Sequence, residues 1–208
     1  DPIPSRGLGD VYKRQIEAHF INSSGLNLVI NEINYKSSDS FETGDWVEIY
    51  NPNEVDIDIS GWILKDDNDS NEFILPDGTI IEGNDYLVVV RNADDFADFY
   101  PEIPSFVGEF DFGLSASGDA VRLFNSDLIL QDEVYYESSS PWPSLSNGEG
   151  YTLELIDPSY DNSLPSSWSN INYHGSPDAI NSATASINEE DSFFTRVYPN
   201  PFIETLYI

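Results

Sequence analysis

The sequence predicts an all-β protein, a sandwich or a barrel, with one short helix near residues 93–99. Short segments rich in Val, Ile, Leu, Trp and Tyr recur along the chain, and several alternate apolar with polar residues. Turn-forming Asn, Asp, Gly and Pro residues separate these segments. Hydrophobic residues make up 39% of the chain and aromatic residues 13%, which is enough to form a core. Many short strands with frequent turns are typical of these two architectures.

The expected strands follow one another from Leu28 onward. Val29, Ile33 and Tyr35 alternate with Glu32 and Asn34, as in a strand with one buried face. Further strands are expected at 46–50, 57–59, 62–64, 73–75, 79–81, 86–90, 120–124, 128–130, 134–136 and 152–155. The segment 86–90 is apolar throughout, so we expect a central strand that is covered on both faces.

One segment favours a helix instead. Asn92 is a good N-capping residue, and Asp94 and Asp95 fall in the first turn, where negative charge is favourable. Apolar residues, Phe96 among them, fall on one face of this segment, and Pro101 ends it.

The composition excludes several kinds of site. The chain has 38 acidic and 8 basic residues, a net charge of -30, which repels phosphate backbones and anionic membranes but could gather divalent cations. It has no cysteine, so disulfides, thiolate metal sites and cysteine nucleophiles are excluded. No run approaches the roughly 20 apolar residues of a membrane-spanning helix.

The chain divides into parts of different composition. Residues 1–15 hold Arg6, Lys13 and Arg14 and resemble the translation of a sequencing-library adapter, so we expect a foreign leader, with a natural basic linker as the alternative. Since the sequence begins with Asp1, we expect a fragment or a processed product. The expected organisation is a leader at 1–15, a linker at 16–27, a main domain at 28–181, an acidic linker at 182–193 and a further, incomplete unit at 194–208.

A series of motifs carries a family resemblance. They are LVINEINY at 28–35, DWVEIYNP at 45–52, ISGWIL at 59–64, LPDG at 75–78, YLV at 86–88 and LSASGD at 114–119. In this order, up to about Trp168, they resemble the bacterial lamin tail domain. The resemblance implies an immunoglobulin-like β-sandwich that accompanies nucleases, other hydrolases and surface proteins. It brings no catalytic residues.

A second resemblance concerns the end of the chain. The motif consists of Tyr198, Pro199, Asn200, Pro201 and Phe202. Together with the apolar residues that follow, it resembles the opening of the type IX secretion C-terminal sorting domain. The resemblance implies export to the cell surface or the medium, with the type IX secretion machinery as a partner.

Glu32 and Glu48 are the first candidates for chemistry. Paired carboxylates could perform acid/base work, as in glycoside hydrolysis. Alternatively, each could accept backbone or indole hydrogen bonds and fix a strand end. We favour the second interpretation because both residues lie inside motifs that define the fold.

The run 65–72 offers closely spaced oxygen ligands, with Asp66, Asp67 and Asp69 as calcium candidates. It lacks the glycine and the terminal glutamate of an EF-hand loop, and a solvated hairpin loop is the interpretation that we favour. Apart from calcium, no cofactor is expected.

The segment 113–118, GLSASG, nearly matches a nucleophile elbow, but its fifth residue is Ser rather than Gly. The chain has only two histidines, His19 and His174, near the edges of the matched region, so we interpret the segment as a turn.

Trp142 lies between two prolines and is the tryptophan that we expect to be exposed, as a candidate for stacking on a sugar. The other three tryptophans are expected to pack in the core or to clamp loops.

The sequence favours a non-catalytic interaction or spacer module of a secreted or cell-surface bacterial protein. The alternative is an accessory domain of a secreted hydrolase or nuclease whose catalytic part lies outside this sequence. A protein or polysaccharide at the cell surface is the expected partner. Nucleic acid is not expected, because no basic stripe offsets the negative charge.

Overall fold

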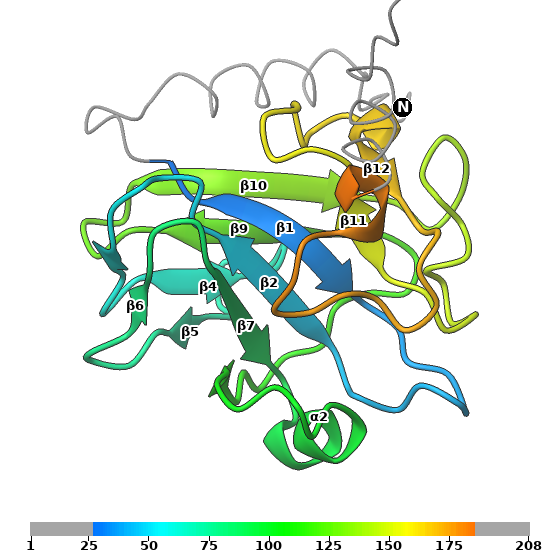
Figure 1. Ribbon diagram of the computed structural model, residues 1–208, viewed down its shortest axis with the longest axis horizontal. Coiled ribbons are helices and arrows are strands. Elements are labelled where there is room, and N and C mark those ends of the chain that lie inside the picture. Colours follow the sequence, from blue (N-terminus) through cyan, green and yellow to red (C-terminus); the bar gives the residue numbers. More distant parts are fainter. Residues whose placement is uncertain (1–26, 186–208) are drawn as a thin grey trace, which may run out of the picture.

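The computed structural model describes residues 27–185 (Figure 1). The expected leader at 1–15, His19 and the sorting motif at 198–202 lie outside these residues. The strands are β1 (Val29–Asn34), β2 (Trp46–Tyr50), β3 (Ile57–Asp58), β4 (Ile63–Lys65), β5 (Phe73–Ile74), β6 (Ile80–Ile81), β7 (Tyr86–Val90), β8 (Val107–Gly108), β9 (Asp119–Phe124), β10 (Leu130–Tyr136), β11 (Leu153–Leu155) and β12 (Trp168–Ser169). The helices are α2 (Ala93–Phe99) and the 3-10 turn η1 (Pro165–Ser167), and residues 182–185 are also helical.

Two main sheets form an immunoglobulin-like β-sandwich, which confirms the predicted all-β class. The larger sheet has the strand order β12-β11-β1-β2-β7-β8, and the smaller has the order β10-β9-β4-β5. A short ribbon of β3 and β6 stands beside them. All the pairs are antiparallel except β7 with β8. The strand β1 lies between β11 and β2, so residues far apart in the sequence meet on this sheet.

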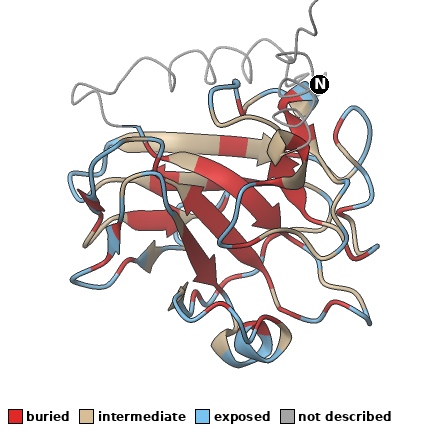
Figure 2. Ribbon diagram, viewed as in Figure 1, coloured by how far each residue is buried: buried red, intermediate tan, exposed pale blue. Residues whose placement is uncertain are grey.

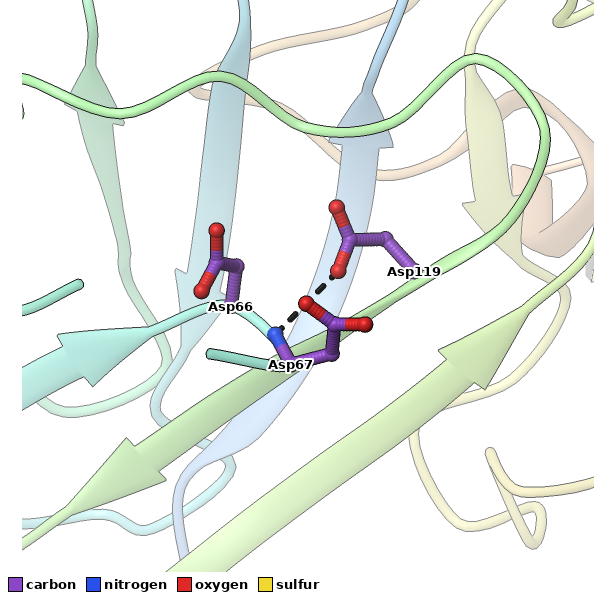
Figure 3. A group of neighbouring side chains, drawn as sticks. All are labelled: Asp66, Asp67 and Asp119. Carbon is purple, nitrogen blue, oxygen red and sulfur yellow. Dashed lines mark hydrogen bonds between the residues drawn. The ribbon is translucent and has the colours of Figure 1, made fainter. Parts of the chain in front are cut away.

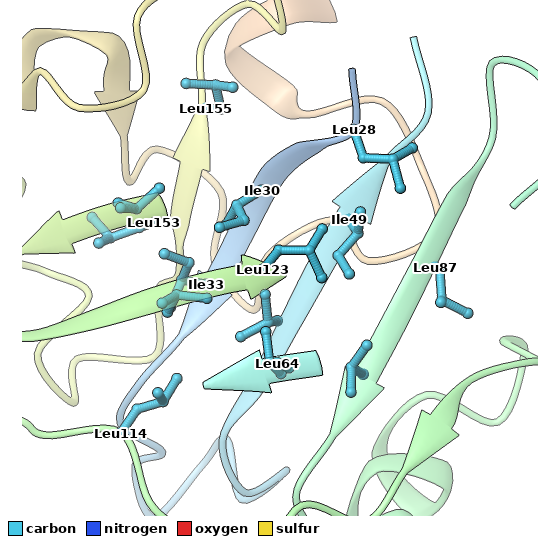
Figure 4. Packing of buried hydrophobic residues seen from close by; sticks show 14 of the residues in the cluster. Leu28, Ile30, Ile33, Ile49, Leu64, Leu87, Leu114, Leu123, Leu153 and Leu155 are labelled. Carbon is cyan, nitrogen blue, oxygen red and sulfur yellow. The ribbon is translucent and has the colours of Figure 1, made fainter. Parts of the chain in front are cut away.

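The main core lies between the two sheets (Figure 4). Ile33, Ile49 and Leu153 point inward from the larger sheet, and Leu64 and Leu123 meet them from the smaller one. All five are almost completely buried. Each such side chain stabilises the fold by about 1.5–3 kcal/mol when it leaves water. Figure 2 shows that buried residues follow the strands while exposed ones follow the loops.

A β-bulge interrupts β1 between Ile30 and Glu32. An extra residue shifts the alternation of the strand, so Ile30 and Ile33 both belong to the main core. Asn31 and Glu32 make their contacts on the opposite, outer face of the sheet. The bulge therefore places two polar side chains next to each other on one face.

The helix α2 covers part of that outer face. Asn92 caps the helix, and its side-chain oxygen accepts a hydrogen bond from the backbone N–H of Asp95 at 3.1 Å. Phe96 packs with Trp46 and Val88 in a second apolar cluster. Because β7 contributes to this cluster and to the main core, it is covered on both faces, as predicted.

The structure departs from the predicted strands in a few places. Leu128 lies in a turn with a positive φ of 61°, and its N–H donates to the carbonyl of Asn125, so the strand expected at 128–130 begins only at Leu130. The short edge strands β8 and β12 carry no alternating pattern, and the sequence did not indicate them.

Candidate functional site

The predicted calcium run brings together a different set of acidic residues. Asp66 and Asp67, after the end of β4, meet Asp119 at the start of β9 (Figure 3), and ligand oxygens of these three lie within 4.8 Å of one another. Asp69 is not part of this group, since its carboxylate forms an ion pair with Arg122 at 2.8 Å. The acidic residues whose ligand oxygens lie close together are therefore Asp66, Asp67 and Asp119, which we call the acidic loop cluster.

Hydrogen bonds already engage much of this cluster. Asp119 accepts backbone N–H groups from Asp67, Ala120 and Ser115 at 2.7–3.1 Å. Burial raises the pKa of the Asp119 carboxyl, and these bonds oppose the rise. Asp66 accepts the N–H of Asn68 at 2.8 Å and a further bond from an asparagine amide. Calcium takes six to eight oxygens, so the three residues would supply only part of a site.

A second group of carboxylates lies on the outer face of the larger sheet. Glu32 on β1 is directly opposite Glu48 on β2 and also directly opposite Glu154 on β11. The three glutamates, which we call the carboxylate row, are each 0% exposed. Water screens like charges that lie side by side on a protein surface. In a buried layer such as this one, little solvent screens them, so the carboxylates repel one another strongly when they are ionised.

The segment 172–184, which we call the C-terminal strap, covers this row. Figure 1 shows the segment in orange in front of β1 and β2. The Ser176 N–H donates to Glu32 at 3.1 Å, and the Asp178 N–H donates to Glu48 at 2.6 Å. These bonds confirm the interpretation that Glu32 and Glu48 accept backbone hydrogen bonds. They fasten a distant segment rather than fix a strand end.

Two asparagines connect the strap to the sheet beside the row. Asn31 donates to Glu48 at 2.8 Å and to the side-chain oxygen of Asn181 at 3.2 Å. Asn181 in turn donates to the carbonyls of Asn31 and Leu155 at 3.0 and 2.9 Å. Both amides are buried, so the network has little competition from water.

Burial raises the pKa of each glutamate in the row, because the charged form loses water. For Glu48 the result is a pKa of about 8. The pKa of Glu32 rises well above its ordinary value, first through burial and then through the neighbouring charges of Glu48 and Glu154. Within residues 27–185, the ion pairs of lysine and arginine involve other carboxylates. Burial and the lack of a paired cation within these residues therefore favour the protonated form of these glutamates.

The other sequence candidates occupy structural positions. The segment 113–118 includes a turn in which the Gly118 N–H donates to the carbonyl of Ser115, and the Ser115 hydroxyl is 3.0 Å from that of Ser117. His174 instead stacks on Phe41, with ring centroids 5.1 Å apart. Within the described residues, no hydrogen bond joins Ser115 to His174.

Trp142 is not exposed, contrary to our expectation. Its exposed fraction is 6%, and its ring lies 6.1 Å from that of Trp168 in the main core. The indole of Trp168 donates to the carbonyl of Asn162 at 2.7 Å. Trp142 is thus a core residue whose ring offers no open face for a sugar.

The fold and these sites define an immunoglobulin-like β-sandwich domain. The sequence matches the family model of the Lamin Tail Domain over residues 22–138, more than half of the chain. The chain therefore belongs to the lamin tail domain family, whose fold is immunoglobulin-like and non-catalytic. Comparison with curated proteins gave no match. Along residues 27–185, no helix has the length and apolar character needed to cross a membrane.

The matched residues end before the sheet does. Glu154 on β11, the strand β12 and the strap all lie beyond residue 138. Because β11 pairs directly with β1, these later residues complete the larger sheet of this chain. Sequence reasoning identified Glu32 and Glu48 but missed Glu154, whose place in the row depends on this long-range pairing.

Proposed function

We propose that this chain is a non-catalytic interaction or spacer module of a secreted or cell-surface bacterial protein, exported by type IX secretion. The burial of the carboxylate row carries the non-catalytic part of the proposal. An acid/base pair must reach its substrate within hydrogen-bond distance. Glu32 and Glu48 are 0% exposed and hold the strap in place, so a substrate cannot reach them while the strap is closed.

The motif at 198–202 supports the export part of the proposal, through its resemblance to the start of a sorting domain. The net charge of -30 suits an exported protein that stays in solution and does not adhere to anionic lipid. A protein or a polysaccharide at the cell surface is the partner that we propose for such a module.

Assays of the purified chain test the first part. Residues 16–208 should show no turnover of glycosides, esters or nucleic acids above that of a buffer blank. The matched variants are Glu32→Gln, Glu48→Gln and, as an exposed control, Glu137→Gln. Turnover that disappears in the first two variants and persists in the control would contradict the proposal.

Cell fractionation tests the second part. An antibody raised against residues 28–181 should label intact source cells or detect the protein in the medium. In a strain that lacks the type IX machinery, the signal should accumulate inside the cell envelope. A signal confined to the cytoplasm of both strains would refute the export proposal while leaving the non-catalytic part intact.

A further inference from the structure

In the described part of the chain, no lysine or arginine forms an ion pair with the carboxylate row. Of its six carboxylate oxygens, Glu154 Oε2 is buried and has no hydrogen-bond partner within the described residues. The neighbouring Oε1 of the same residue accepts the hydroxyl of Ser176. An ionised carboxylate in this position would keep a charged oxygen away from both water and donors, which is unfavourable.

The side chains of the row are not arranged to bind a metal ion that could neutralise this carboxylate. Over residues 27–185, the acidic group with converging ligand atoms is the acidic loop cluster, on another part of the fold. The row runs across β11, β1 and β2 instead, one carboxylate per strand. Protons, which need no converging ligands, are the cations that suit this geometry.

The strap is the part of the structure that can respond. Glu32, Glu48 and Glu154 lie in paired strands, whereas the part of the strap that contacts them through Ser176 and Asp178 is irregular, between a β-bridge at Tyr173 and helical residues from Ser182 on. Its N–H groups at Ser176 and Asp178 end on the row. Opening the strap would admit water to all three carboxylates and leave the β-ladders intact. We propose that the strap is a proton-controlled latch, which closes when the carboxylate row holds protons and opens when the row ionises.

The groups that face the row from neighbouring elements do not compensate its charge. Tyr100, at the end of α2, interacts with Glu32, while Tyr86 in β7 and Asp178 in the strap interact with Glu48. Behind them, Asp85 lies near Asp178, and the carbonyl of His174 accepts the hydroxyl of Tyr100. Burial raises the pKa of Asp178 and of both tyrosines, and it lowers the pKa of His174. The carboxyl and phenol groups cannot carry a positive charge, and a lowered pKa favours the neutral form of His174, so these groups do not offset the charge that proton loss leaves on the row.

Hydrogen exchange of the full chain, followed by mass spectrometry from pH 5 to pH 9, tests the latch. Each peptide's rate is divided by its intrinsic rate at the same pH. Protection of a peptide covering 172–184 should fall with rising pH, by up to about tenfold per pH unit for each proton released on opening. Protection of a peptide covering β9 and β10 should change much less. A strap that is equally protected at all pH values, or that loses protection in step with β9 and β10, would overturn the proposal.

Variants and a second observable identify the groups. Glu154→Gln keeps an oxygen for the Ser176 hydroxyl and removes the charge, so it should flatten the pH dependence of strap protection. Glu137→Gln, at an exposed position, should leave that dependence unchanged. Infrared spectroscopy of the native chain near pH 6 should show the C=O stretch of a buried protonated carboxyl. Its absence there would refute the latch even if a variant failed to fold.

Discussion

Glu32 and Glu48 are direct cross-strand neighbours in the pairing of β1 with β2, and neither side chain is exposed. Like charges in this relationship destabilise a sheet, and burial increases the effect. The structure offsets it in part with hydrogen bonds from Thr152, Ser176 and Asp178. The remaining cost depends on pH, since protonation removes the repulsion.

The free energy of unfolding should therefore fall as pH rises from about 5 to about 8. The pKa of Glu48 is raised from its ordinary value of 4.5, which applies to the unfolded chain, to about 8 in the folded chain. Between these two pH values the folded chain therefore binds more protons than the unfolded chain. A group of this kind stabilises the fold below its unfolded pKa, and the contribution is lost as pH rises through its folded pKa. Urea denaturation across this range provides the measurement. Stability that increases with pH would show that the row is ionised throughout.

Gly175→Ala should destabilise the domain more than Gly78→Ala. Both glycines have a positive φ, of +75° and +83°, so alanine introduces backbone strain of about 1–2 kcal/mol at either position. At Gly175 a Cβ would also meet the Glu32 carboxylate and would lie 2.9 Å from Thr152, whereas nothing lies within 4 Å at Gly78. Thermal melting should show a loss of about 2–8 °C for Gly78→Ala and a larger one for Gly175→Ala. Equal losses would mean that the strap does not press against the row.

Calcium should stabilise the chain only weakly. Extracellular modules bind calcium with Kd values of up to about 1 mM, and half-filling such a site adds about 0.4 kcal/mol. The melting temperature should then rise by about 2 °C or less at about 1 mM calcium. The rise should vanish in Asp67→Asn and persist in Asp69→Asn, because Asp69 pairs with Arg122 outside the acidic loop cluster. A rise that vanishes in both variants would restore the set expected from the sequence, which includes Asp69, and no rise in any protein would support a solvated loop.

Duplex DNA should not bind at physiological salt. Non-specific binders reach Kd values of about 10⁻⁴–10⁻⁶ M by releasing counterions with lysine and arginine. In this chain Lys65, Arg91 and Arg122 each form an ion pair with a carboxylate. A gel-shift assay at micromolar protein is a sufficient measurement, and a shifted band that disappears with added salt would contradict the expectation.

Residues 27–185 should melt cooperatively, within a few degrees of the full chain. All the strands of the two main sheets and both apolar clusters lie within these residues. A chain that ends at residue 138 should not fold, because it lacks Leu153 and Leu155 from the core and leaves β1 without β11. Near-UV circular dichroism distinguishes the two outcomes. A folded 27–138 would show that β11 and the strap are additions to a complete sandwich.

Much of the fold could be predicted from local signals. The alternation around Ile33, the apolar run at 86–90 and the cap at Asn92 each depend on residues close together in the sequence. Such patterns record which face of a strand or helix is buried. They are sufficient for the all-β class and for α2, because both follow from local periodicity and turn chemistry.

The sites depended on contacts that no local pattern records. Asp119 belongs to the acidic loop cluster although it lies 52 residues beyond Asp67 in the sequence, and its carboxylate accepts the N–H of Asp67. Glu32 meets Thr152 across 120 residues. Trp142 has prolines on both sides, which are typical of an exposed loop, but its burial comes from packing against Trp168. Pairing across the sandwich, rather than local sequence, decides these positions.

The bulge in β1 makes the number of residues in this strand important for the fold. Ile30 and Ile33 reach the core, and Asn31 and Glu32 reach the strap, only because one extra residue separates the two apolar positions. If the strand kept its present length but lost the bulge, strict alternation would turn either an isoleucine outward or Glu32 into the apolar core. A point substitution in this strand changes one contact, whereas a residue inserted or deleted outside the bulge would turn the side chains on one side of the change to the opposite face. The number of residues in β1 therefore matters to the fold as much as their identity.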